Sequence, residues 1–300
     1  MTLKFSTPLW TALVTPFNTN NEIDFSSLEV LLQRQEKAKN GVVLIGSTGE
    51  GLALTTQEKK KIVSFATSLN LNIPLMVGVG GFQLEEQLHW LEFCETQKIH
   101  AYLLLTPLYA KPGIEGQFHW FKSLMDHVKK PCMLYNVPSR SAIKLHHETL
   151  QKLSHHPNLW AVKEASGSLE EFAKYRLDAP HIEIFSGDDG LTPFFASLGA
   201  KGLVSVASNA WPLATHRFVE CSLKGEHQGL FPLWNEVSSA LFASSNPVPV
   251  KHLLHEQKLI PTDLLRAPLS SKDLVSRNDL MNVDKKVRSW LKEKFGEEEC

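Results

Sequence analysis

A lysine ends one of the most apolar segments of the chain. Leu159, Trp160, Ala161 and Val162 are typical of a strand that packs on both faces, and Lys163 follows them directly. An ammonium group is costly to bury unless another charge pairs with it or it gives up its proton. A neutral amine in an apolar site is a nucleophile that attacks carbonyl carbons. The segment therefore indicates a solvated lysine, an ion-paired lysine or a reactive amine.

Other polar groups also follow strand-like runs. Hydroxyls, glycines and prolines are concentrated in four short segments: GSTGEG at 46–51, TPLYAKPG at 106–113, YNVPSR at 135–140 and SGDDG at 186–190. Taken alone, a lysine at a strand end is more often a surface residue or an ion-pair partner. Active sites of parallel barrels, however, gather at the carboxyl ends of the strands. The shared position of these segments favours a site that includes Lys163.

The elements that must position these groups alternate along the chain. The expected strands are 9–14, 42–45, 74–79, 101–105, 132–135, 159–163, 182–186 and 202–206. Helical patterns separate them at 26–39, 56–69, 84–97, 115–128, 147–154, 168–177 and 190–198, and Thr55 with Glu58 has capping-box spacing. Eight near-continuous apolar strands predict an α/β fold, a (β/α)8 TIM barrel, with a doubly wound open sheet as the alternative.

Helical patterns continue after the last expected strand. They cover 213–224, 228–242, 247–257 and 283–295, whereas 263–282 is polar and poorly periodic. We interpret residues 1–224 as a barrel catalytic domain and residues 225–300 as a C-terminal helical extension.

Strand alternation predicts which side chains enter the barrel. Leu159, Ala161 and Lys163 share one face of their strand, and Trp160 lies on the other. The bulky Trp160 suits the helix-packed outside, whereas the small Ala161 leaves room beneath an inward Lys163. By the same rule, Tyr135 is expected to point inward.

The composition excludes several classes of partner. The chain has 31 basic and 32 acidic residues, so it has no electrostatic footprint for nucleic acid or an anionic membrane. It contains no apolar run long enough for a membrane helix and no cleavable signal pattern. Its four cysteines (Cys94, Cys132, Cys221 and Cys300) form no CxxC pair. We expect a cytoplasmic protein with reduced thiols and without a metal site.

Seven ordered motifs resemble one enzyme family. They are GSTGEG, TPLY–KP, YNVPSR, AVKEASG, SGDD, KGLVSVASN and NPVPVK, and the similarity runs from about Thr11 to Arg266. This pattern resembles the dihydrodipicolinate synthase family of pyruvate-dependent class I aldolases, whose superfamily includes N-acetylneuraminate lyase. The resemblance implies condensation of pyruvate with L-aspartate 4-semialdehyde to give 4-hydroxy-tetrahydrodipicolinate, in diaminopimelate and lysine biosynthesis. It also implies a covalent Schiff base and no separate cofactor.

The resemblance assigns four catalytic positions. Lys163 matches the lysine that forms the Schiff base with pyruvate, and Tyr135 matches the tyrosine that relays protons to the adduct. Ser47 stands where the synthases usually have a threonine that links two tyrosines in a relay. Tyr109 matches the second tyrosine, which in the family reaches across a tight dimer. A homodimer or homotetramer is therefore expected.

Four further positions match substrate-binding residues of the family. Thr48 matches the residue that holds the pyruvate carboxylate, and Arg140 matches the arginine that receives the carboxylate of the aldehyde. Gly187 and Val204 correspond to backbone positions that line the pocket. The planar guanidinium fork of Arg140 suits a carboxylate.

Some residues depart from the synthase pattern. Ser47 resembles the neuraminate lyases, whereas Arg140 and the segments around Lys163 and Gly187 resemble the synthases. Another pyruvate aldolase, a neuraminate lyase or a keto-deoxy sugar acid aldolase, is therefore the alternative, and a catalytically silent binding barrel is a remote one. Leu108 and Ala142 replace an aromatic residue and a glycine that are usual in the family.

The resemblance also concerns feedback by lysine. Of the positions that match the family's lysine site, Glu86 is retained. Six others differ from the lysine-sensitive pattern: Gly51, Leu52, Thr56, Lys59, Phe82 and Leu108. We predict that lysine inhibits the enzyme weakly or not at all.

Overall fold

A computed structural model describes residues 5–299, in which eight parallel strands close into a barrel. The strands are β1 (Leu9–Ala12), β2 (Gly41–Leu44), β3 (Leu75–Val79), β4 (Ala101–Leu105), β5 (Cys132–Asn136), β6 (Leu159–Glu164), β7 (Glu183–Ser186) and β8 (Gly202–Ser205). Because β1 pairs with both β2 and β8, the sheet has no free edge. The predicted (β/α)8 TIM barrel is confirmed, and the open sheet is wrong.

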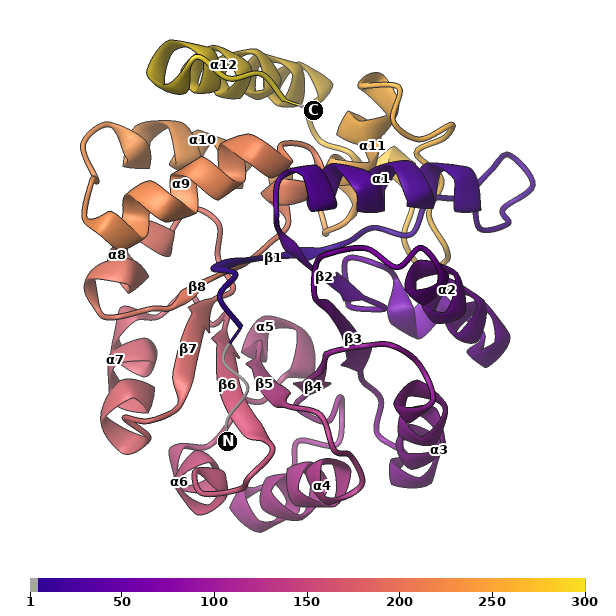
Figure 1. The fold of residues 1–300 in the computed structure, drawn as a ribbon, viewed down its shortest axis with the longest axis vertical. Helices are drawn as coiled ribbons and strands as arrows, with labels where there is room; N and C mark the ends of the chain where they lie inside the picture. Colours follow the sequence, from indigo (N-terminus) through magenta and orange to yellow (C-terminus); the bar gives the residue numbers. More distant parts are fainter. Residues whose placement is uncertain (1–4, 300) are drawn as a thin grey trace.

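Helices surround the barrel (Figure 1). They are α1 (Phe25–Lys37), α2 (Thr56–Ser68), α3 (Leu84–Glu95), α4 (Ile114–Asp126), α6 (His147–Leu153), α7 (Leu169–Asp178), α8 (Thr192–Ser197) and α9 (Pro212–Lys224). Thr55 and Glu58 form the predicted capping box at the start of α2. The short helix α5 (Pro138–Ser141) follows β5 directly and has no periodic signal in the sequence, because one turn is too short to show a period.

The barrel interior holds its own apolar cluster, in which Trp160 has an unexpected place. Trp160 packs inside against Trp10 and Phe185, with ring centroids 5.9 and 5.5 Å away. The prediction that Trp160 faces the outer helices is therefore wrong. The cause is a bulge: Cys132 pairs with Leu159 and Met133 pairs with Ala161, so Trp160 is an extra residue in the ladder. Leu159 consequently packs with the apolar residues between the barrel and its helices, while Ala161 lies inside the barrel as predicted.

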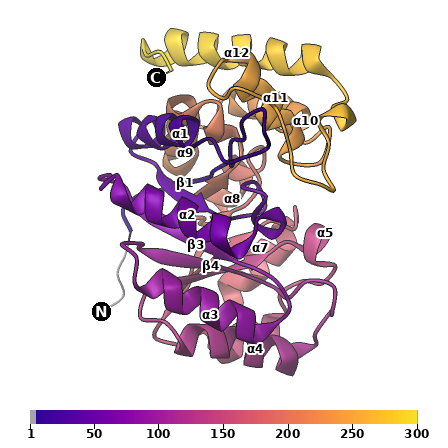
Figure 2. The same ribbon diagram turned by 90° about the vertical axis from the view of Figure 1, so that its right-hand side faces the viewer.

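The C-terminal residues form three helices beside the barrel. They are α10 (Leu230–Leu241), α11 (Val248–Glu256) and α12 (Arg277–Phe295), and Figure 2 shows α12 as the outermost layer. The helix α12 begins six residues before the predicted 283, because Ser276 caps it and its first turn is polar. Its buried face consists of Leu280, Val283, Asp284, Val287 and Leu291.

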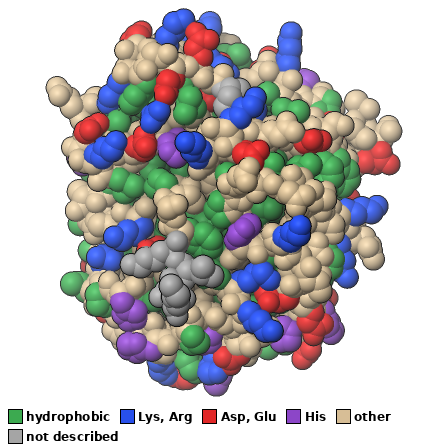
Figure 3. Space-filling view, viewed as in Figure 1, with side chains coloured by type: hydrophobic (Ala, Val, Ile, Leu, Met, Phe, Trp, Pro, Cys, Tyr) green, Lys and Arg blue, Asp and Glu red, His purple; other side chains and the backbone are tan. Residues whose placement is uncertain are grey.

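The surface carries both signs of charge. On the face drawn in Figure 3, acidic and basic side chains are interspersed rather than segregated. None of the helices in residues 5–299 combines the length and the apolar character that crossing a bilayer requires. Cys94, Cys132 and Cys221 are buried free thiols, and Cys300 lies outside the described residues.

Candidate active site

Lys163 and Tyr135 lie side by side inside the barrel. They are register partners on the neighbouring strands β6 and β5, and their exposed fractions are only 5% and 8%. The Lys163 Nζ lies 4.2 Å from the centroid of the Tyr135 ring. Tyr135 also belongs to the interior apolar cluster, together with Ala161. The amine therefore faces an aromatic ring in a mainly apolar enclosure, where it is poorly hydrated.

A glycine leaves room for the lysine chain. A β-carbon built on Gly187, directly after β7, would lie 2.9 Å from Lys163 Cε and 2.5 Å from Ala165 Cβ. Any side chain at this position would therefore displace Lys163 or its neighbour. Val204 on β8 is buried in the same interior cluster as Tyr135. Gly187 therefore lies against Lys163, and Val204 lies in the apolar cluster that also contains Tyr135.

The loop after β2 carries Ser47 and Thr48. Thr48 is buried, and its Oγ1 accepts a hydrogen bond of 2.9 Å from Asn246 Nδ2. Ser47 is partly exposed and lines a cavity of about 730 Å³. Two backbone hydrogen bonds close the loop, from Glu50 to Ser47 and from Gly51 to Gly46, each 3.1 Å long. The loop therefore holds two adjacent hydroxyls in fixed positions.

Arg140 comes from the short helix α5. Its side chain is exposed, and its Nη2 donates a hydrogen bond of 3.1 Å to the carbonyl oxygen of Asn246. The helix ends at Ala142, whose φ of 60° lies in the left-handed region that favours glycine. This conformation gives a physical reason for the glycine that is usual in the resembling family at that position.

One cavity connects four of the eight predicted residues. Ser47, Tyr109, Tyr135 and Arg140 line it, and Lys163 adjoins it through its contact with the Tyr135 ring. Tyr109 lies in the loop after β4 and is 91% exposed. Within one chain, Tyr109 is therefore not enclosed with Tyr135. The structure places Tyr109 at the rim of the site rather than inside it.

Two acidic residues follow β7 and lie near Lys163. Asp189 is fully buried and accepts hydrogen bonds from Ser205 Oγ and from the backbone amides of Val206 and Ala207. Burial raises the pKa of Asp188 to about 6, the charge of Asp189 adds to the rise, and the Lys163 ammonium opposes it. Within residues 5–299, no group of three potential ligands has the arrangement that a metal ion requires.

Asn246 is a site residue that sequence reasoning missed. It contacts both Thr48 and Arg140, although it belongs to the C-terminal extension. The motif NPVPVK contains Asn246 and contributes to the resemblance. Its partner Thr48 is 198 positions away, however, and periodicity carries no information about contacts at that separation.

A buried ion pair fixes the same extension to the loop after β2. Lys251 Nζ lies 2.8 Å from Glu50 Oε1, and both side chains are almost completely buried. The second carboxylate oxygen accepts a hydrogen bond from the Arg266 backbone amide at 2.7 Å. Burial lowers the pKa of Lys251 to about 8, and the Glu50 carboxylate opposes this shift. The extension therefore supports the loop that holds Ser47 and Thr48.

Comparisons with known proteins agree with this geometry. A protein from Wolbachia pipientis wMel named 4-hydroxy-tetrahydrodipicolinate synthase is 49% identical over 95% of this chain and 97% of its own length. A Chlamydia felis protein of the same name is 44% identical over 94% of this chain and 96% of its own. The crystal structure of a chloride-inhibited dihydrodipicolinate synthase from Acinetobacter baumannii, complexed with pyruvate, superposes with a TM-score of 0.87. It has 29% identity and covers 94% of this chain and 99% of that one.

A family profile covers most of the chain as well. The profile described as the dihydrodipicolinate synthetase family matches residues 6–286. This match includes the barrel, the eight predicted site residues and the part of the extension that supplies Asn246 and Lys251. The chain belongs to the dihydrodipicolinate synthetase family.

Proposed function

We propose that this protein condenses pyruvate with L-aspartate 4-semialdehyde through a Schiff base on Lys163, giving 4-hydroxy-tetrahydrodipicolinate. The observation that carries the proposal is the buried Lys163 amine beside Tyr135, at the carboxyl end of the barrel strands. Membership of the family and the names of the relatives support this reaction.

The chemistry requires an amine and several proton transfers. The Lys163 amine attacks the ketone carbon of pyruvate, and loss of water leaves an iminium ion. Its positive charge allows a proton to leave the methyl group, which gives an enamine. The enamine carbon adds to the aldehyde carbon of the second substrate. The amino group of that substrate then displaces Lys163 from the iminium carbon and closes the ring, which frees the enzyme.

Hydroxyl groups carry the protons in this proposal. The ring of Tyr135 lies 4.2 Å from the Lys163 amine, and its hydroxyl exchanges protons with the adduct. Ser47 continues the relay along the wall of the cavity. Tyr109 of a second subunit completes it, since Tyr109 is too exposed within its own chain to do so. No metal or separate cofactor is required by this sequence of steps.

Two residues are proposed to hold the substrate carboxylates. The Thr48 hydroxyl, oriented by Asn246, receives the carboxylate of pyruvate. Arg140, at the mouth of the cavity, receives the carboxylate of the semialdehyde. Gly187 and Val204 form the wall beside the adduct.

Turnover of competing substrates tests the proposal. The purified protein is expected to consume aspartate semialdehyde with pyruvate and to leave N-acetylneuraminate and keto-deoxy sugar acids unchanged. Arg140→Ala is expected to raise KM for the semialdehyde by about 10- to 100-fold, with KM for pyruvate nearly constant, because a charge-assisted pair is lost. Arg176→Ala, a change on the outer helix α7, is the control. Faster cleavage of a sugar acid would establish the alternative aldolase instead.

A further inference from the structure

We propose that Asn136 and Glu164 form a positioning pair that holds Tyr135 and Lys163 in their catalytic arrangement. Each member of the pair directly follows one member of the reactive pair: Asn136 follows Tyr135, and Glu164 follows Lys163. The inference rests on the proposed function, because it concerns how that reaction's amine and hydroxyl are held.

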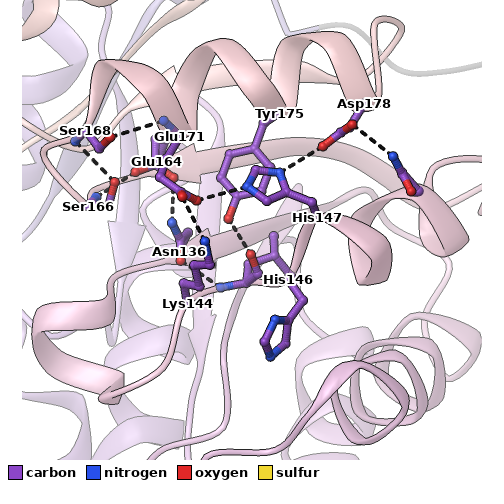
Figure 4. Close-up of polar contacts among 12 residues, drawn as sticks. Asn136, Lys144, His146, His147, Glu164, Ser166, Ser168, Glu171, Tyr175 and Asp178 are labelled. Atoms are coloured by element: carbon purple, nitrogen blue, oxygen red, sulfur yellow. Dashed lines mark hydrogen bonds and ion pairs between the residues drawn. The ribbon is translucent and has the colours of Figure 1, made fainter.

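The geometry of the pair is specific. Asn136 and Glu164 are register partners on β5 and β6, as Tyr135 and Lys163 are. Successive side chains of a strand point to opposite faces, so the two pairs lie on opposite sides of the same sheet. Asn136 Nδ2 donates a hydrogen bond of 2.6 Å to Glu164 Oε2, and both residues are completely buried. The contact therefore joins the two strands on the face opposite the reactive pair. Figure 4 shows Asn136 and Glu164 with the polar residues around them.

Every oxygen atom of the pair's side chains has a donor. Glu164 Oε1 accepts a hydrogen bond of 2.7 Å from the Ser166 amide, and Asn136 Oδ1 accepts one of 2.8 Å from the Leu145 amide. The hydrogen bond from Leu145 holds the segment that follows α5, the short helix that contains Arg140. The Glu164 carbonyl oxygen also accepts a hydrogen bond of 2.6 Å from the amide of Gly187, the residue that leaves room for Lys163. The pair is thus linked, through the backbone or through a hydrogen bond, to three predicted site residues: Tyr135, Lys163 and Gly187.

Burying a carboxylate and an amide lowers the stability of the fold unless hydrogen bonds compensate for the lost hydration. Burial raises the pKa of Glu164, and hydrogen bonds from Ser166 and Asn136 oppose this shift. A fully hydrogen-bonded polar network specifies one arrangement, whereas apolar side chains at the same positions would pack without that constraint. Displacement of a reacting group by about 1 Å can cost about 100-fold in rate. The pair therefore suits the task of fixing the separation between the Lys163 amine and the Tyr135 hydroxyl.

A swap of donor and acceptor tests this role. Glu164→Gln places two amide donors opposite each other or leaves the Ser166 amide facing a donor, and it keeps the side-chain volume. We expect kcat to fall about 10- to 100-fold, with KM for pyruvate changing less than about threefold. The double variant Asn136→Asp with Glu164→Gln restores a donor opposite an acceptor and keeps the net charge. We expect it to recover kcat to within about threefold of the wild type.

Two measurements separate positioning from general stability. The first is the rate at which pyruvate and borohydride inactivate each variant, which is expected to follow kcat through the series. The second is thermal unfolding of each variant. Its control is Thr11→Val, which removes another buried side-chain hydrogen bond, the 2.7 Å bond from Thr11 to Gln35. That control is expected to lower Tm while kcat per folded molecule stays at the wild-type value.

Three results would overturn the inference. One is an unchanged kcat in Glu164→Gln, and another is a loss explained entirely by the unfolded fraction. The third is a double variant that remains as slow as the single one. If the wild type itself fails to turn over pyruvate and the semialdehyde, the proposed function falls and the positioning role falls with it. An active wild type with an equally active Glu164→Gln variant contradicts the positioning role alone.

Discussion

Lys163 is buried to an extent that is unusual for a lysine side chain. The Tyr135 ring covers its amine, and Gly187 leaves space beside its methylene groups. The carboxyl groups of Asp188 and Asp189 lie close enough to Lys163 for their charges to interact with it. The site therefore combines poor hydration with nearby negative charge, which would stabilise the iminium ion of the proposed reaction.

Asp188 gives a prediction about stability and pH. Its folded-state pKa of about 6 lies above the ordinary 3.8, so the folded state favours the protonated form. The carboxylate consequently costs stability above about pH 6, and this cost disappears as the pH falls towards 4. Asp188→Asn is expected to raise the free energy of unfolding by about 1–2 kcal/mol near pH 8 and by only about a third of that amount near pH 4.5.

Urea unfolding at the two pH values measures this effect. Asp273→Asn, at an exposed position, is the matched control. It is expected to change the free energy of unfolding by a similarly small amount at the two pH values. A gain for Asp188→Asn that is the same at both pH values would contradict the explanation by burial.

At the level of elements, the sequence predicts the position and burial of the strand β6 but not the direction of all its side chains. Its apolar run and its lysine identify a buried strand that ends in a site. Alternation placed Ala161 correctly but failed for Trp160, because the bulge opposite Cys132 and Met133 shifts the register by one residue. A bulge depends on the partner strand, so a single strand's sequence does not reveal it.

The contacts of the C-terminal extension were beyond prediction for a related reason. The eight strands and most helices follow from local periodicity, and the residues at the carboxyl ends of the strands follow from the topology of the barrel. Asn246 and Lys251 reach the loop after β2 only through tertiary packing. Hydrophobic patterns do not encode such polar contacts over long separations, so these supporting residues became visible only in the structure.

The end of α5 supplies a prediction at the same scale. Ala142 has a φ of 60°, which costs an alanine about 1–2 kcal/mol, while glycine adopts it without strain. Part of this gain is offset because glycine makes the unfolded chain more flexible. Ala142→Gly is expected to raise the free energy of unfolding by about 0.5–1 kcal/mol in urea titrations. Ala243→Gly, an exposed position with ordinary backbone geometry, should lower it instead, and stabilisation by both changes would contradict the argument.

At the scale of the whole molecule, the rim of the site exposes several large apolar side chains. Leu52, Phe82 and Tyr109 are exposed by 62%, 72% and 91%, which is costly for large apolar groups in water. Leu52 and Tyr109 line the same cavity as Tyr135. The proposed dimer would cover this rim and supply the relay tyrosine from the partner.

Sedimentation and activity together test the dimer. Leu52→Glu combined with Phe82→Glu is expected to give a monomer and to lower kcat at least about 10-fold, because the relay loses Tyr109 of the partner subunit. Leu177→Glu, at an 81% exposed leucine on the outer helix α7, should leave both properties unchanged. A fully active monomer would contradict the shared relay.

Some of the positions that match the family's lysine site line this cavity. Lys59 and Glu86 line the same cavity; burial lowers the pKa of Lys59, and the Glu86 carboxylate opposes this shift by favouring the charged form. A cationic side chain at position 59 disfavours a ligand that carries two ammonium groups. We therefore expect little inhibition when lysine is titrated into the assay at millimolar concentration. Strong inhibition below a millimolar concentration would contradict this prediction.

The central claim is that Lys163 forms a covalent adduct with pyruvate. Borohydride reduces an iminium ion to a stable secondary amine, so treating the protein with pyruvate and borohydride traps the adduct permanently. We predict loss of activity and one modified peptide containing Lys163, found by mass spectrometry, with no modification when pyruvate is omitted or in Lys163→Ala. A protein that stays unmodified and active after this treatment, or one modified at a different lysine, would contradict the proposed mechanism.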